Sequence, residues 1–233
     1  MKTLVVSDVH WKFGSHNGVY EGNAYDWLLN TVNSVKPTAI LGLGDYGHAW
    51  ATQGWNTLSA LAPASLAYGN HDNMEALKGA RNPDGTRCLV NDGEIRVVDG
   101  LATGFINGIL SSKSKMKDGT PRKTAEEYLS YAPRISRVDV LATHMAPREM
   151  GSTPLHESDD LRVMESVLKT VKPRLFLCGH LAGPYKIATI GSTVGVRVDS
   201  SPAEQHYAVI TGKGTVVKVY HNNELVDSVD VPL

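Results

Sequence analysis

The sequence predicts an α/β fold for its 233 residues, and two patterns carry this prediction. Short apolar runs of strand length alternate with segments of helical periodicity from the N-terminus onward, as in proteins that alternate strands and helices. From Lys186 the pattern changes to a period of two around turns that contain glycine or asparagine, which is typical of antiparallel strands. The chain shows no internal repeat and no biased linker, so we expect one domain over residues 1–233.

The first part of the chain is expected to alternate between buried strands and helices. Asn23 is a suitable N-cap and Pro37 a suitable stop for the first helix. Its apolar residues Trp27, Leu28 and Val32 recur at helical spacing. The strands expected here are residues 3–8 (TLVVSD), 38–45 (TAILGLGD) and 64–72 (ASLAYGNHD), and further helices are expected around Thr57–Leu61 and at 73–79 (NMEALKG).

The middle of the chain contains the longest predicted helix, over residues 158–173. Ser158 is a suitable N-cap for it, and Lys169 and Lys172 lie in its last turn, where cations stabilise the helix dipole. Another helix is expected at 121–133. The strands expected from here on are Cys88–Val90, Ile95–Val98, Leu101–Ile106, 138–144 and 174–180, followed by the period-two segments 186–190, 194–199, 207–220 and 224–230.

Charge and cysteine content narrow the classes of function. The formal net charge is −1, so any binding of a polyanion must come from a local site. Cys88 and Cys178 are the only cysteines and form no CxxC motif, which argues against a disulfide framework. The apolar start of MKTLVVSDVH is too short for a signal peptide, and no run approaches the ~18 apolar residues of a membrane span. We therefore expect a soluble cytoplasmic protein without a membrane partner.

Five of the apolar strands end in residues that bind metals. In α/β folds, ligands gather outside the carboxyl ends of strands, so five such ends would build one dense polar cluster. A single Asp or His after a strand is more often a cap or an edge residue, but four of the nine histidines fall in these five loops. Their joint occurrence indicates a metal site. The motifs are SDVH (Asp8, His10), LGD (Asp45), GNHD (Asn70, His71, Asp72), ATH (His144) and CGH (His180).

This ordered set of motifs resembles the calcineurin-like metallophosphoesterases over residues 3–185. The resemblance implies a four-layer α/β/β/α sandwich with two mixed sheets, and a phosphoesterase site with two divalent metal ions. In that site Asp8 and His10 would hold the first ion, and Asp45 would bridge both ions. The residues implied for the second ion are Asn70, His144 and His180.

The resemblance also implies roles for the two residues that follow Asn70. His71 would contact the substrate phosphate and protonate the leaving oxygen, and a histidine in that role contributes ~10²–10⁴-fold to the rate. Asp72 would orient His71 or cap the helix that follows it. Oxygen and imidazole ligands without thiolate suit Mn, Fe, Zn or Ni, and we expect Mn²⁺.

One family ligand is missing from the last motif. The family pattern is G-H-x-H, but here Ala182 stands at the position of the final histidine. The first ion would then keep Asp8, His10 and the shared Asp45, with the remaining position filled by water or by another histidine. His16 and His48 are the nearest candidates in the sequence. Alternatively the first ion binds weakly, and we expect an active enzyme with a labile first site.

The substrate class follows from what the sequence lacks. The Ser/Thr protein phosphatases of the family carry GDxxDRG, whereas this chain reads GDYGHAW over 44–50. The DNA-repair nucleases of the family have additional regions that 233 residues can hardly hold. We therefore expect a phosphodiesterase for cyclic nucleotides, 2′,3′-cyclic before 3′,5′-cyclic, or for similar small diesters. The alternatives are a nuclease or phosphomonoesterase on the same site, or a degenerate, non-catalytic metal- or nucleotide-binding scaffold.

Two further segments admit a functional and a structural interpretation. The lysine-rich residues 111–123 (SSKSKMKDGTPRK) are either a solvated surface loop or a basic lid that meets the substrate phosphate or a nucleic-acid end. Trp11 and Phe13 either stack on a base or anchor their loop in the core.

Overall fold

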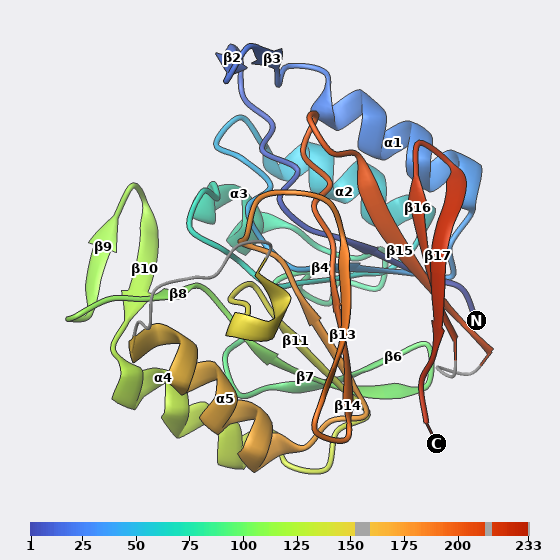
Figure 1. The fold of residues 1–233 in the computed structure, drawn as a ribbon. Coiled ribbons are helices and arrows are strands. Elements are labelled where there is room, and N and C mark those ends of the chain that lie inside the picture. Colours follow the sequence, from blue (N-terminus) through green and yellow to red (C-terminus); the bar gives the residue numbers. More distant parts are fainter. Residues whose placement is uncertain (152–158, 213–215, 233) are drawn as a thin grey trace.

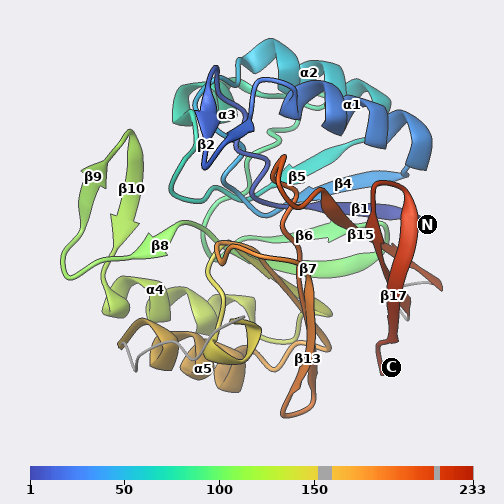
Figure 2. The same ribbon diagram turned by 45° about the horizontal axis from the view of Figure 1, so that its top comes forward.

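The structure is a computed structural model, and it describes residues 1–151, 159–212 and 216–232. Two six-stranded mixed sheets pack face to face, with helices covering both outer faces (Figures 1 and 2). The predicted four-layer α/β/β/α arrangement is therefore confirmed. No helix in the described part of the chain has the length and apolarity that crossing a membrane requires.

The first sheet has the order β17-β16-β15-β1-β4-β5. Its strands β1, β4 and β5 are parallel, whereas β15, β16 and β17 add to it in antiparallel fashion. The helices α1, α2 and α3 lie over its outer face (Figure 2). The bounds are β1 Thr3–Val6, β4 Ala39–Gly42, β5 Ala64–Leu66, β15 His206–Thr211, β16 Val216–His221, β17 Glu224–Asp230, α1 Ala24–Val35, α2 Thr52–Leu61 and α3 Met74–Gly79.

The second sheet has the order β13-β14-β12-β11-β7-β6. Its four central strands are parallel, and β6 and β13 are antiparallel edge strands. The helices α4 and α5 cover its outer face (Figure 1). The bounds are β6 Ile95–Val98, β7 Leu101–Ile106, β11 Val140–Thr143, β12 Leu175–Cys178, β13 Lys186–Ile190, β14 Thr193–Arg197, α4 Ala125–Tyr131 and α5 Asp159–Val171, with 3₁₀ turns at Ala132–Ile135 and Arg148–Met150.

Two small β-structures stand outside these sheets. One is the hairpin of β2 (Ser15–His16) and β3 (Val19–Tyr20). The other is a three-stranded sheet of β8 (Ile109–Leu110), β10 (Thr120–Lys123) and β9 (Lys115–Lys117). The lysine-rich segment is thus a β-hairpin beside the main body, and its interpretation as a loop is wrong.

The central strands are buried on both faces, which explains why they read as continuous apolar runs. Leu4 and Val6 of β1 belong to the core cluster under α1, while Val5 between them belongs to the core between the two sheets. In the second sheet Leu141 faces the helices and its neighbour Val140 faces the other sheet. The polar residues that follow each apolar run therefore mark where the chain leaves the sheet.

Several element predictions need correction. Residues 88–90 form no strand: Leu89 makes only an isolated bridge to Leu66, where β5 ends. The helix predicted from residue 121 begins at Ala125, because Thr124 and Glu127 form a capping box and residues 120–123 belong to β10. The helix predicted around Thr57–Leu61 already begins at Thr52.

The capping and C-terminal predictions were also incomplete. Asn23 occupies the N-cap position of α1, but its side chain makes no capping hydrogen bond, and Ser158 lies outside the described residues. The strands after Lys186 do not form one antiparallel sheet. The strand β14 pairs with β12 in parallel and extends the second sheet, whereas β15 to β17 extend the first.

Candidate metal centre

The five predicted loops converge because of how the strands are paired. The strands β1, β4 and β5 are neighbours in the first sheet and run in the same direction, so the loops after them emerge at one edge. The strands β11 and β12 are parallel neighbours in the second sheet, and their loops meet the first three across the layer between the sheets. Residues distant in the sequence are thereby gathered at one end of the sandwich.

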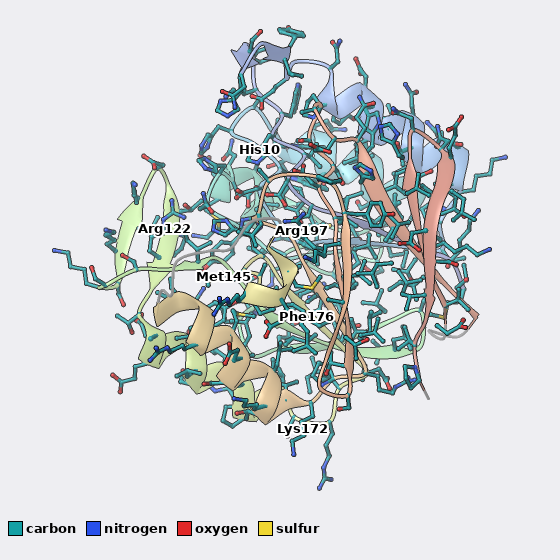
Figure 3. The ribbon with its side chains drawn as sticks, viewed as in Figure 1. His10, Arg122, Met145, Lys172, Phe176 and Arg197 are labelled. Atoms are coloured by element: carbon teal, nitrogen blue, oxygen red, sulfur yellow. The ribbon has the colours of Figure 1, made fainter. Side chains whose placement is uncertain are left out.

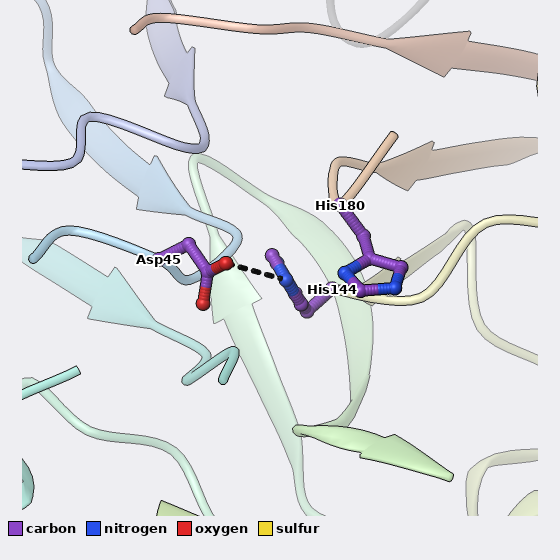
Figure 4. A group of neighbouring side chains, drawn as sticks. All are labelled: Asp45, His144 and His180. Atoms are coloured by element: carbon purple, nitrogen blue, oxygen red, sulfur yellow. Dashed lines mark ion pairs between the residues drawn. The ribbon is translucent and has the colours of Figure 1, made fainter. Parts of the chain in front are cut away.

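Two groups of possible ligands share one aspartate. Asp8, His10 and Asp45 each offer one ligand atom, and these atoms all lie within 4.8 Å of one another. Asp45, His144 and His180 satisfy the same criterion (Figure 4). Because Asp45 belongs to both groups, the structure brings together a potential pair of adjacent cation positions with a carboxylate common to both.

The backbone at these residues adopts an unusual conformation. Asp8, His10, Asp45 and His180 have positive φ values of 56°, 52°, 56° and 69°, in a region that side chains other than glycine rarely occupy. Backbone hydrogen bonds between the loops hold them there, including Asp8 N–H to Gly44 O (2.9 Å) and His10 N–H to Asp45 O (3.0 Å). Such strain clusters at functional sites, where the surrounding structure compensates for its cost.

The Asp45 carboxylate has two distinct sides. Its Oδ1 accepts hydrogen bonds from the backbone N–H groups of Asn70 and His71, the latter at 2.6 Å. Its Oδ2 lies 3.2 Å from His144 Nε2 and 3.9 Å from His10 Nε2. Burial raises the pKa of Asp45, but the charge of His144 and its hydrogen bond outweigh this and lower the pKa far below its usual value. Asp45 is therefore a fixed anion.

The second group of residues fits a cation. His144 Nδ1 lies 3.0 Å from Leu43 O, so it carries the proton and leaves the Nε2 lone pair for a metal. This Nε2 is buried and faces the Asp45 carboxylate at 3.2 Å, and the buried Asn70 Oδ1 has no hydrogen-bond partner among the described residues. A cation held here would coordinate both atoms. Burial and the nearby His144 lower the pKa of His180 to about 4, so its imidazole is neutral and available as a ligand.

The field in this region favours positive charge. Burial lowers the pKa of His144, but the charge of Asp45 and their hydrogen bond raise it to about 9. A divalent ion bound here would be stabilised by the same negative charge and would take the place of the proton on His144.

The group of Asp8, His10 and Asp45 offers fewer ligands than the second group, to which Asn70 also contributes. His10 Nε2 lies 3.7 Å from Asp8 Oδ1. The Asp8 carboxylate accepts hydrogen bonds from the Ser7 hydroxyl (2.6 Å) and from the backbone N–H of His180 (3.0 Å). These bonds orient Asp8 toward the cluster.

His71 and Asp72 occupy different surroundings. The His71 ring is exposed, with its centroid 5.5 Å from that of His10, so it can reach a substrate beside the first group. The Asp72 carboxylate is buried and accepts hydrogen bonds from the N–H groups of Asp45 (3.0 Å), Tyr46 (2.7 Å) and Gly69 (2.6 Å). Asp72 thus ties the two loops together. The expectation that it caps the next helix is wrong, because Asn73 does so.

Ala182 lines a cavity of about 430 Å³. Asp8, His10, His71 and His180 line the same cavity. His16 and His48 line this cavity too, but within the described residues neither belongs to a group of clustered ligand atoms.

Sequence reasoning missed three acidic residues that line this cavity, Glu21, Asp199 and Glu204, of which Asp199 lies beside Ala182 and Gly183. Asp199 is buried and accepts hydrogen bonds from Gly183 N–H (3.2 Å) and Ser201 N–H (3.0 Å), so it holds the chain beside Ala182. Burial and the charge of Asp8 raise the pKa of Asp199 to about 6. Its sequence signal, an Asp after an apolar run, matched that of the other loops, but the run was assigned to an antiparallel tail.

Trp11 and Phe13, which follow His10, were each expected either to stack on a base or to anchor their loop in the core. Trp11 packs against Tyr25 and Trp50 and donates a hydrogen bond from Nε1 to Gly22 O (2.9 Å), which favours the anchoring role. Phe13 is 81% exposed. Neither lines the cavity.

Close packing around the ligands leads to a first prediction. A Cβ at Gly69 would lie against Asp45 Oδ1, inside van der Waals contact, and 2.7 Å from His144 Nε2. We expect Gly69→Ala to lower the kcat of the expected hydrolysis by about 10²-fold. The added methyl group would displace Asp45 and His144, and small displacements in a reaction site have effects of that size. The matched control is Gly54→Ala in α2, where the nearest atom would be 3.3 Å away. Equal kcat and Mn²⁺ content in both variants would contradict this packing.

The comparisons with known proteins agree with this geometry. The family model for calcineurin-like phosphoesterases matches residues 1–184. Among solved structures, TT1561 of Thermus thermophilus has a TM-score of 0.65 at 14% identity, over 94% of this chain and 98% of that chain. GAP50, described as the anchor in the inner membrane complex of Plasmodium, has a TM-score of 0.59 at 12% identity, over 99% and 88%. These two likenesses show the fold alone. No curated protein matches the chain.

Proposed function

The chain belongs to the calcineurin-like phosphoesterase family, whose members hydrolyse phosphoesters in a metal-dependent reaction, and we propose that it acts on small phosphodiesters, cyclic nucleotides among them. The observation that carries this proposal is Asp45, whose carboxylate belongs to both groups of clustered ligand atoms. A site of that design suits the displacement of an alcohol from phosphorus by water.

The roles of the residues follow from their positions. Asp8, His10 and the shared Asp45 would hold one cation, and the other would be held by Asp45, Asn70, His144 and His180. When bound, the two cations polarise the phosphate, make the attacking water more acidic and neutralise charge on the leaving oxygen. His71, exposed beside His10, would donate its proton to that oxygen.

The cavity supports a small substrate. Its volume of about 430 Å³ lies within the usual range for small-molecule sites, roughly 300–1,000 Å³, and matches one nucleotide better than a long polymer. Asp8, His10 and His71 line the cavity, and the leaving alcohol would stand beside them. We favour 2′,3′-cyclic over 3′,5′-cyclic nucleotides, because a strained five-membered ester demands less from a first metal position that lacks one ligand.

A second candidate is a non-catalytic scaffold, and Ala182 in place of a ligand favours it. The structural neighbour GAP50 is described as an anchor. Against this stands His71, since binding alone has no need of a proton donor beside the leaving group. The alternatives are therefore a non-catalytic scaffold and a nuclease or phosphomonoesterase that uses the same site. The assay below distinguishes them.

The test is a substrate panel measured with and without Mn²⁺. It comprises bis(p-nitrophenyl) phosphate, 2′,3′-cAMP, 3′,5′-cAMP, single-stranded DNA and a phosphomonoester. We expect Mn²⁺-dependent turnover of the diesters, with 2′,3′-cAMP preferred. Turnover of none of them under any of Mn²⁺, Fe²⁺, Zn²⁺ or Ni²⁺ would leave the scaffold as the remaining function.

The missing ligand leads to a second prediction. We expect Ala182→His to lower the Kd of the weaker Mn²⁺ by about ten-fold or more, since even outer partners of metal ligands change affinity about 10- to 100-fold. Calorimetric titration with Mn²⁺ measures this. Ala203→His places a histidine elsewhere on the same cavity wall and serves as the control. Identical binding in parent and Ala182→His would mean that the first position is already complete.

We also propose a cellular location and a domain organisation for the protein. A cytoplasmic location is supported by Cys88 and Cys178, which are both free and buried. A single domain over residues 1–233 is supported by the pairing of β15 with β1, which joins the C-terminal strands to the sheet that begins the chain.

A further inference from the structure

The small sheet of β8, β10 and β9 is attached to the loop that carries Asn70 and His71. Thr120 Oγ1 can donate its one proton to Asn70 O at 3.1 Å or to Lys117 O at 3.0 Å, and Arg122 Nη2 donates to Asn70 O at 3.4 Å. Arg122 projects from β10, on the side of the molecule where this sheet stands (Figure 3). The hairpin therefore places one of its basic side chains against the loop that carries Asn70 and His71.

Arg122 differs from the other basic residues of this segment. Lys115 and Lys117 on β9 are exposed. Lys123 is buried, but its Nζ has three partners, Asp92 (3.1 Å), Tyr68 Oη (2.7 Å) and Asn107 O (2.8 Å). Arg122 is only 6% exposed, and its Nη1 has no hydrogen-bond partner among the described residues.

An unpaired N–H on a buried guanidinium destabilises the fold unless a water molecule or an anion accepts its hydrogen bond. The surroundings show where such an anion would lie. The charge of Asp45 acts on Arg122, and the charge of Arg122 acts in turn on His71. The guanidinium thus stands within electrostatic reach of both the shared carboxylate and the proton donor.

We propose that Arg122 binds a non-bridging phosphate oxygen of the substrate, from the Asn70 side of the metal centre. The ligand class is a tetrahedral phosphoryl oxyanion, which the planar guanidinium fork binds through two parallel N–H donors. This inference rests on the proposed function for its substrate. Its own content, an oxyanion subsite at β10, is tested by binding alone.

A structural role is the competing explanation. Arg122 would then act only by holding the Asn70 carbonyl and thereby the Asn70 side chain. Thr120 separates the two explanations, because it can donate to the same carbonyl without carrying charge. Thr120→Val removes that donor and keeps the shape of the side chain.

The experiment is calorimetric titration of the full chain with inorganic phosphate at saturating Mn²⁺, with the Mn²⁺ content of every variant measured by elemental analysis. We expect Arg122→Gln to keep the parent's Mn²⁺ content and to weaken phosphate binding by roughly 10- to 100-fold, as for the loss of a charge-assisted hydrogen bond. Thr120→Val and Lys117→Gln should bind phosphate like the parent. Arg122→Lys, which keeps the charge and most of the volume, should bind phosphate several-fold more weakly than the parent.

Three results would overturn the inference. They are a parent that binds no phosphate, an Arg122→Gln or Arg122→Lys variant that binds it like the parent, and a Thr120→Val variant that loses as much affinity as Arg122→Gln. If Arg122→Gln does not fold, Arg122→Lys decides. Failure of the proposed function has a different signature, since a parent that hydrolyses no diester can still show phosphate binding that depends on Arg122.

Discussion

Asp45→Asn is expected to abolish hydrolysis and to remove both cations. The carboxylate belongs to both ligand groups, so one substitution weakens both positions at once. The hydrogen bonds that Asp45 Oδ1 accepts are kept in the variant, because an asparagine carbonyl still accepts from the N–H groups of Asn70 and His71. We expect kcat to fall by at least about 10³-fold, since bound cations supply several kcal/mol of transition-state stabilisation. Initial rates on bis(p-nitrophenyl) phosphate and elemental analysis measure the two effects.

The matched control is Asp84→Asn. Asp84 is exposed and accepts hydrogen bonds from Thr86 N–H and Oγ1, which an asparagine carbonyl also accepts. This variant loses the same charge and should keep the parent's rate and metal content. If Asp45→Asn kept two cations and most of its activity, a bridging role for Asp45 would be untenable.

His71→Ala is expected to lower kcat by about 10²–10⁴-fold on a nucleotide diester while leaving the metal content unchanged. The side chain is exposed and the backbone N–H that donates to Asp45 remains, so the loop should keep its shape. The loss should be much smaller on bis(p-nitrophenyl) phosphate, because p-nitrophenolate leaves readily without a proton. The dependence on the leaving group is therefore the diagnostic measurement.

His221→Ala is the control for this variant, since that imidazole stacks on His206 and is not among the residues that line the cavity. It should leave both rates unchanged. An equal loss on both substrates would show that His71 binds or positions the phosphate and does not protonate the leaving oxygen.

Much of the site could be predicted because the strands that deliver it are buried on both faces. Leu4 to Val6 and Leu141 to Ala142 read as apolar runs, and the polar residue after each run marks where the chain leaves the sandwich. Asp8, Asp45 and His144 follow such runs directly or after one residue. Their convergence then needed only parallel pairing, which the alternation of strands and helices predicts.

The remainder depended on pairings that local sequence does not determine. Asp199 reaches the cavity because β14 pairs in parallel with β12, whereas the period-two pattern of its neighbourhood favoured an antiparallel tail. Arg122 belongs to a basic segment in which Lys115 and Lys117 face solvent. The Asp118-Gly119 pair, with φ values of 52° and 79°, is a hairpin signal that could have predicted β9 and β10. It could not have predicted that β10 packs on Asn70.

The most direct test of the account is the anomalous scattering of a crystal soaked in Mn²⁺. We predict two peaks beside the Asp45 carboxylate, the first near Asp8 and His10 and the second near His144 and His180. The first peak should be the weaker in the parent and should strengthen in Ala182→His. Density for a single ion distant from Asp45, or none at all at high Mn²⁺, would contradict the dinuclear centre on which the proposed hydrolysis depends.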